Sequence, residues 1–190
     1  LAHEALDRCA AAGARVLRGY CENYGGAQPL QPFLQMLRGQ FGIEHDDSAR
    51  DVSRRVDAGL ATLAAAPDAA VASQRDALLH ALTLNDPGRR TASPQAPAVM
   101  LAELVALFVR LAAPPGRLVL FIDDWQWADD ASYQVLTALL AQRYTPLGVL
   151  LATRGFATTE AALQGSLARL ELEPLSDAEA FQTAHRLLPS

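Results

Sequence analysis

Residues 118–122 form a short apolar run, LVLFI, followed at once by two aspartates. An unbroken run of this length is typical of a β-strand buried on both faces. Such a strand needs packing partners on each side of its sheet, which constrains the chain to a layered arrangement. Two further strands are predicted at residues 14–21 and 148–153, and a more alternating one at residues 167–172.

Between these candidate strands, apolar residues recur with helical spacing. We predict helices at residues 1–12, 33–43, 51–63, 73–84, 99–113 and 132–143, and one that begins at Ser176. Residues 85–97, NDPGRRTASPQAP, contain three prolines and no apolar periodicity, which predicts a linker. Strands that alternate with helices indicate an α/β fold with a mainly parallel sheet.

Two of the predicted helices begin with capping signals. Ser176 and Glu179 have the spacing of a capping box, in which each side chain bonds the other residue's backbone N–H. Asp129 or Asp130 is placed to cap the helix at residues 132–143.

Composition and charge exclude several classes of function. Hydrophobic residues make up 51% of the chain but aromatic residues only 6%, so alanine supplies much of the apolar content and favours helix. The net charge of −5 argues against a dominant nucleic-acid-binding face. The most apolar long segment, residues 99–113, is too short and too charged to span a bilayer. Cys9 and Cys21 fit no CxxC motif. We therefore expect no membrane segment, no direct nucleic-acid contact and a cytoplasmic location.

Charged side chains follow two of the predicted strands. Asp123 and Asp124 follow residues 118–122, and Arg154 follows residues 148–153. Ligands of open α/β sheets bind beyond the carboxyl ends of the strands, so these groups converge if the two strands are neighbours. One carboxylate then suits Mg²⁺ held through water, the second suits an attacking water, and the guanidinium suits a γ-phosphate.

Position alone leaves a structural interpretation open. Aspartate is common at strand ends as a turn former and helix cap, so Asp123 and Asp124 also fit a polar turn that leads a buried strand out of the core. Trp125 and Trp127 offer rings that stack on a base, although packing under the following helix suits them better.

The segment at residues 118–140, LVLFIDDWQWADDASYQVLTALL, resembles the Walker B segment of AAA-type P-loop ATPases of the signal-transduction (STAND-like) class. Trp125 and Gln126 stand where Leu and His are commonest in that family, at turn positions. The resemblance extends in order over residues 13–37, 85–90, 148–155 and 170–180, which resemble the second strand and its loop, the linker, the sensor strand and the passage into a helical lid.

The resemblance implies a three-layer P-loop NTPase-like fold with a parallel sheet, and ATP and Mg²⁺ as cofactors. It implies an ATPase core at residues 1–173 and the start of a helical lid at residues 174–190. By the same resemblance Asp123 is the Mg²⁺ acid, acting through water, Asp124 is the water-orienting catalytic acid, and Arg154 is the γ-phosphate sensor.

The sequence departs from this family in one large respect. A P-loop, GxxxxGK[ST], cradles phosphates with its backbone amides and reaches them with its lysine. These 190 residues contain no such motif, and all 16 basic residues are arginine. We therefore expect that the chain starts just after a P-loop; the alternative is a natural member of the family that has none. We also expect it to lack the first strand of the sheet, which by resemblance lies beside the sensor strand, so that alone it is inactive and partly open.

The predicted function is that of an ATP-binding, ATP-hydrolysing switch in a multidomain signalling or transcription regulator. The predicted partners are ATP, other domains of a longer protein and copies of the chain in a nucleotide-dependent oligomer. Arg143 and Arg169 are equal candidates for an arginine finger in such an oligomer. The alternative is a scaffold that binds nucleotide, or only partner domains, without hydrolysis.

Overall fold

The computed structural model describes residues 1–23, 29–63, 69–83, 97–112, 117–142, 146–154 and 168–187. The chain divides into two units, Leu1–Glu160 and Ala161–Ser190. The predicted linker at residues 85–97 lies outside the described residues except for Pro97, and the predicted domain boundary at residue 173 stays a prediction.

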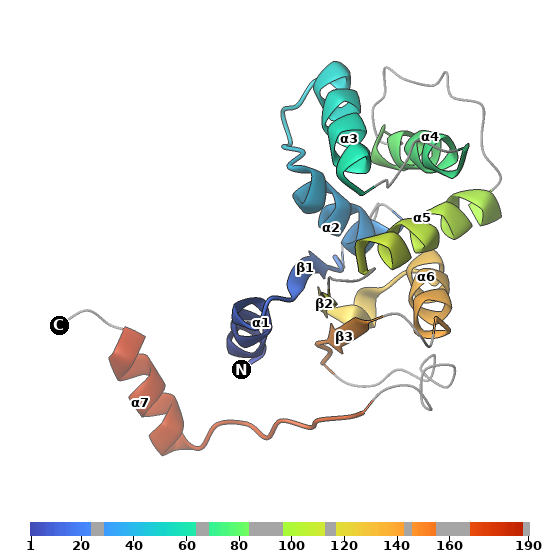
Figure 1. The fold of residues 1–190 in the computed structure, drawn as a ribbon. Coiled ribbons are helices and arrows are strands. Elements are labelled where there is room, and N and C mark those ends of the chain that lie inside the picture. The colour runs from blue at the N-terminus through green and yellow to red at the C-terminus, as the bar shows by residue number, and fades with distance from the viewer. Residues whose placement is uncertain are drawn as a thin grey trace. The chain divides into compact units, whose positions relative to one another are not determined.

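A parallel three-stranded sheet forms the centre of the first unit (Figure 1). Its strands are β1 (Arg15–Tyr20), β2 (Leu118–Asp123) and β3 (Leu147–Leu151), and β2 lies in the middle. Arg15 pairs with Leu118, and Leu118 pairs with Leu147, so all three strands run in step from the same end. The α/β fold with a parallel sheet is thus confirmed, and it is consistent with a P-loop NTPase-like fold.

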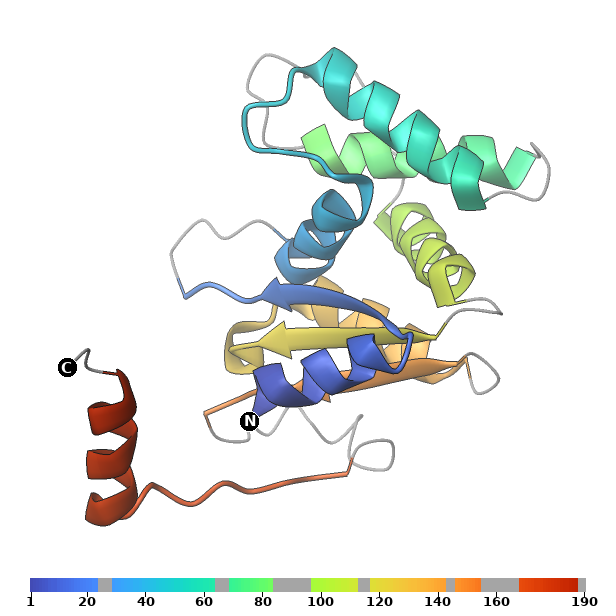
Figure 2. The same cartoon turned by 60° about the vertical axis from the view of Figure 1, so that its left-hand side comes forward.

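Helices lie on both faces of the sheet, as the turned view makes clear (Figure 2). α1 (Ala2–Ala11) covers one face, and α6 (Asp130–Leu140) covers the other, beside α5 (Pro97–Ala112). α2 (Gln31–Phe41) packs against β1, and α3 (Ala49–Leu63) and α4 (Ala69–Thr83) form a further layer beyond α2 and α5.

The core is built around the apolar run LVLFI at residues 118–122. Leu118, Leu120 and Ile122 of β2 are fully buried, as a strand covered on both faces requires. Phe33 of α2 meets Phe108 of α5 edge to face at a centroid distance of 5.6 Å. This aromatic contact joins the two helices above the sheet.

β3 occupies one edge of the sheet among the described strands, and β1 occupies the other. The side chains of β3 alternate between half-buried and exposed, and Leu150 faces solvent. An apolar edge strand of this kind readily pairs with another strand. The expected neighbour of β3, a strand that precedes residue 1, stays a prediction.

The strand predicted at residues 167–172 is wrong for the residues that the structure describes there. Residues 168–176 have no regular structure, and Leu170, Leu172 and Leu175 are exposed. The alternation of LARLEL is local, whereas a strand also needs a neighbour for its backbone N–H and C=O groups. In the described part of this second unit, no strand supplies one.

α7 (Asp177–Leu187) is the helix of the second unit, and its predicted capping box is confirmed. The Ser176 backbone N–H and hydroxyl both donate to Glu179 Oε2, at 2.9 and 2.7 Å. The Glu179 N–H donates back to Ser176 Oγ at 3.4 Å. None of the helices in the described ranges combines the length and the apolar character needed to cross a bilayer.

Candidate functional site

The carboxyl ends of β2 and β3 lie side by side, as the functional interpretation of the sequence requires. Ile122 pairs with Leu151 in the parallel register. The pairing continues past both strands, because the Ala152 N–H donates to Ile122 O at 2.9 Å and the Trp125 N–H donates to Ala152 O at 3.0 Å. These bonds hold the segment after Leu151 against the turn that carries the two aspartates.

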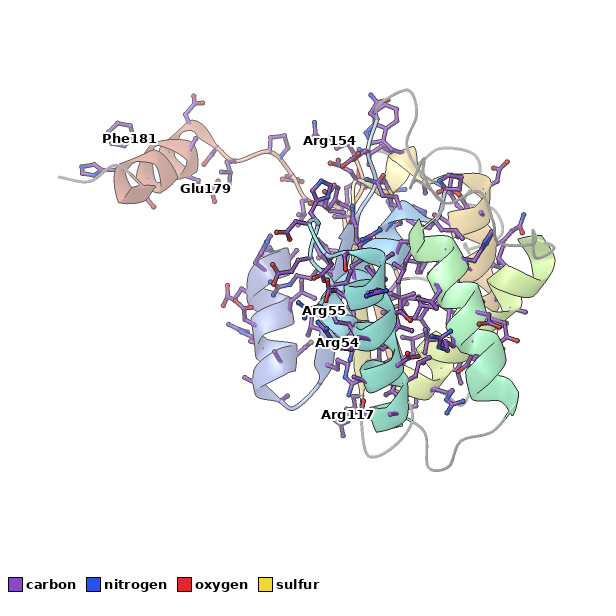
Figure 3. All side chains as sticks on the ribbon, turned by 90° about the horizontal axis from the view of Figure 1, so that it is seen from above. Arg54, Arg55, Arg117, Arg154, Glu179 and Phe181 are labelled. Atoms are coloured by element: carbon purple, nitrogen blue, oxygen red, sulfur yellow. The ribbon has the colours of Figure 1, made fainter. Side chains whose placement is uncertain are left out.

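Asp124 and Arg154 meet at this rim. Arg154 Nε lies 3.5 Å from Asp124 Oδ1, with the Arg154 side chain 85% exposed and the Asp124 side chain 35% exposed. Figure 3 shows Arg154 at one end of the first unit and Arg117, which precedes β2, at the opposite end. An ion pair this exposed contributes about 0–1 kcal/mol to stability. The guanidinium is therefore accessible to a ligand at the carboxyl end of the sheet.

Asp123 and Asp124 differ in backbone conformation and in hydrogen bonding. Asp124 has φ 52° and ψ 40°, the left-handed conformation that asparagine and aspartate tolerate best after glycine. Its N–H donates to Asp123 Oδ1 at 2.9 Å. This local bond stabilises the turn and orients the carboxylate of Asp123.

The Asp123 carboxylate suits a metal ion held through water. It is exposed at the end of β2, and Oδ2 has no hydrogen-bond partner among the described residues. Within the described ranges, no three acidic, histidine or cysteine side chains converge closely enough to hold a metal ion directly. Mg²⁺ commonly takes only one or two protein carboxylates and keeps several waters, so this donor set fits that ion.

Asp129 joins two segments that lie 99 residues apart in the chain. Its Oδ1 accepts from the Ser132 N–H at 3.0 Å, which caps α6 as predicted. Its Oδ2 accepts from the Ser132 hydroxyl at 2.7 Å and from the Leu30 N–H at 3.0 Å. Leu30 precedes α2 and has φ 64°. Asp129 therefore stabilises a strained backbone position beside the site, a role that no sequence spacing indicated.

The two tryptophans differ in burial, and only one of the two candidate arginine fingers lies among the described residues. Trp125 is 1% exposed and packs on Tyr133 at a centroid distance of 4.8 Å, so it belongs to the core and is not open to a base. Trp127 is 47% exposed. Arg169 pairs with Glu171 at 3.5 Å in the second unit, and Arg143 lies outside the described residues.

Cys21 lies against the acids of the site, which the sequence did not indicate. It follows β1, and its N–H donates to Asp123 O at 3.0 Å. Burial, and then the negative charges of Asp129, Asp124 and Asp123, raise the pKa of the Cys21 thiol from its ordinary value of 9.0 to about 12. The thiol therefore stays protonated at neutral pH.

We predict that Cys21 resists thiol reagents in the folded protein, whereas the less buried Cys9 reacts. Between about pH 9 and 12 the folded state keeps a proton that the unfolded state loses, so this contribution to stability is lost as the pH rises. The free energy of unfolding should fall more steeply with pH over this window in the native protein than in Cys21→Ala. Cys9→Ala is the matched control, and an identical slope in all three proteins would contradict the prediction.

The layered sheet and the residues at its strand ends define the class of protein to which the chain belongs. A parallel sheet between helices, with acids at the carboxyl end of its central strand and an arginine after the neighbouring strand, is an α/β domain of P-loop NTPase-like fold. The AAA ATPase domain family matches residues 1–151, and the chain belongs to that family. It is therefore a nucleotide-binding module of the ATPase type, in a family that generally binds nucleotide with Mg²⁺. No curated protein and no solved structure matches the chain.

Proposed function

We propose that the chain is an ATP-binding and ATP-hydrolysing switch module of the signal-transduction class, acting within a multidomain signalling or transcription regulator. The observation that carries this proposal is the meeting of Asp124 and Arg154, from neighbouring strands, at 3.5 Å. An acid and a cation at one rim supply what phosphoryl transfer requires, which is positioning of a water and stabilisation of phosphate charge.

Each residue has a distinct role in this proposal. Asp123 holds Mg²⁺ through water with an exposed carboxylate. Asp124 orients the attacking water. Arg154 contacts the γ-phosphate, and its 85% exposed side chain is free to move toward a bound nucleotide. An Mg²⁺ ion held there by Asp123 would supply positive charge near the phosphate oxygens.

The proposal is tested by measuring ATP binding and ATP hydrolysis in parallel assays, each with and without Mg²⁺. These 190 residues contain no GxxxxGK[ST] sequence, so we expect no hydrolysis from them alone. The protein at its natural length should bind ATP in a Mg²⁺-dependent way and hydrolyse it slowly, as a switch does. Absence of binding at natural length would contradict the proposal.

The alternative function is that of a scaffold that binds nucleotide or partner domains and does not hydrolyse ATP. These 190 residues contain no lysine, so hydrolysis needs a phosphate-binding lysine from elsewhere in the protein, whereas a scaffold does not. Binding without turnover at natural length is the result that supports this alternative. The two functions therefore separate in the same pair of assays.

A further inference from the structure

Gln126 lies between the two residues on which the proposed function depends. It is the middle residue of the short helix η1 (Trp125–Trp127), and its side chain is half-buried. Its amide Nε2 donates to Asp124 Oδ1 at 2.8 Å. Its amide Oε1 accepts from the Arg154 backbone N–H at 3.0 Å. One side chain thus connects the turn after β2 with the segment after β3.

The two partners determine how the amide is oriented. The carboxylate of Asp124 only accepts hydrogen bonds when ionised, and the backbone N–H of Arg154 only donates. Glutamine is an uncharged side chain that offers a donor and an acceptor on one rigid plane, so it satisfies both partners at once. The reversed amide would place a donor against a donor and an acceptor against an acceptor.

We propose that Gln126 is a positioning residue that couples the Asp124 carboxylate to the end of β3, an inference that rests on the proposed function. The direct contact between Asp124 and Arg154 is long, at 3.5 Å, and uses a side chain that is 85% exposed. The two bonds of Gln126 are shorter, and one of them reaches the backbone. Gln126 therefore holds the carboxylate when the Arg154 side chain turns toward a ligand.

The arrangement also assigns the two oxygens of Asp124 to different tasks. Oδ1 is occupied by Gln126 and faces Arg154 Nε. Oδ2 has no hydrogen-bond partner among the described residues, which leaves it as the oxygen that accepts from an attacking water. Because Arg154 is joined through its backbone, a displacement of the segment after β3 would reorient Asp124.

Two substitutions separate the two bonds. Gln126→Glu keeps an acceptor for the Arg154 N–H but replaces the donor to Asp124 with a repelling carboxylate. Gln126→Met keeps the length of the side chain and removes both bonds. Gln134→Met is the matched control, because Gln134 is an exposed glutamine on α6 and makes no part of the site.

The first measurement is the exchange rate of the Arg154 backbone amide hydrogen by NMR, which does not depend on ATP hydrolysis. Loss of one hydrogen bond should raise this rate about tenfold in Gln126→Met. Gln126→Glu and Gln134→Met should stay close to the native rate. An unchanged rate in Gln126→Met would overturn the coupling to β3.

The second measurement is steady-state hydrolysis at natural length. Gln126→Met and Gln126→Glu should both lower kcat by about 10- to 100-fold, because each loses the bond that orients Asp124, with KM for ATP changed less than about twofold. An unchanged kcat beside an altered Arg154 exchange rate would overturn the positioning role. If the native protein hydrolyses no ATP, the proposed hydrolytic function fails, and the exchange measurement still decides whether Gln126 couples the strand ends.

Discussion

Gly19→Ala is expected to destabilise the protein strongly, because β1 and α2 approach each other at this residue. A Cβ built on Gly19 would lie 2.3 Å from the backbone oxygen of Pro32 and 2.8 Å from its carbonyl carbon. These are backbone atoms at the start of α2, where Phe33 is completely buried. The clash can be relieved only by shifting the helix or the strand, since no flexible side-chain end is involved.

We expect the free energy of unfolding to fall by about 1–3 kcal/mol or more in Gly19→Ala, measured by chemical denaturation. Gly39→Ala is the matched control, because Gly39 lies exposed within α2 and a Cβ there meets nothing within 4 Å. That control should gain about 0.5–1 kcal/mol, since alanine favours helix. Native stability in Gly19→Ala would show that β1 and α2 are further apart than described.

The effect of Gly19→Ala should extend to the site. Pro32 is two residues from Leu30, whose N–H donates to Asp129. A displaced α2 would break this bond at a backbone position that is already strained, with φ 64°. Nucleotide binding is therefore expected to weaken along with stability.

Asp124→Asn is expected to lower ATP hydrolysis at natural length by about 10²- to 10⁴-fold, the usual contribution of a positioned acid or base. The shape of the side chain is retained, and an asparagine oxygen still accepts from Gln126 Nε2, so the turn should keep its conformation. What is lost is the negative charge that orients and polarises the water. ATP affinity should stay within a few-fold of the native value.

The matched control for Asp124→Asn is Asp130→Asn, which removes an exposed acid in the first turn of α6. It should leave hydrolysis unchanged and cost at most a few tenths of a kcal/mol in stability through the helix dipole. Unchanged turnover in Asp124→Asn would remove this residue from the proposed role. An equal loss in both variants would point to net charge instead of position.

Much of the fold was predictable from local patterns. The run LVLFI predicted the buried strand β2, and helical spacing predicted α1, α2 and α6 to within a few residues. Capping signals at Asp129 and at Ser176 with Glu179 predicted where two helices begin. Each of these signals depends on residues within one or two helical turns of each other along the chain. Such residues are neighbours both in the sequence and in the folded structure, so their interaction can be predicted from the sequence.

The incorrect strand at residues 167–172 shows where local patterns fail. Alternating polarity makes a segment suitable for a sheet edge, but only a neighbouring strand can satisfy its backbone. The described residues of the second unit contain no such neighbour, and the apolar side chains of this segment are exposed.

By itself, the sequence determined the α/β class, the positions of the helices and of the three strands of the sheet to within a few residues, and the identities of Asp123, Asp124 and Arg154 as residues at or just after strand ends. Only the tertiary structure decided that β2 and β3 are neighbours, that Gln126 joins their ends, and that the Cys21 backbone bonds Asp123. The physical reason is the distance along the chain over which each kind of interaction acts. Hydrophobic periodicity and capping act over a few residues, whereas Gln126 and Arg154 are 28 residues apart and meet only because parallel strands begin in register and end at one rim.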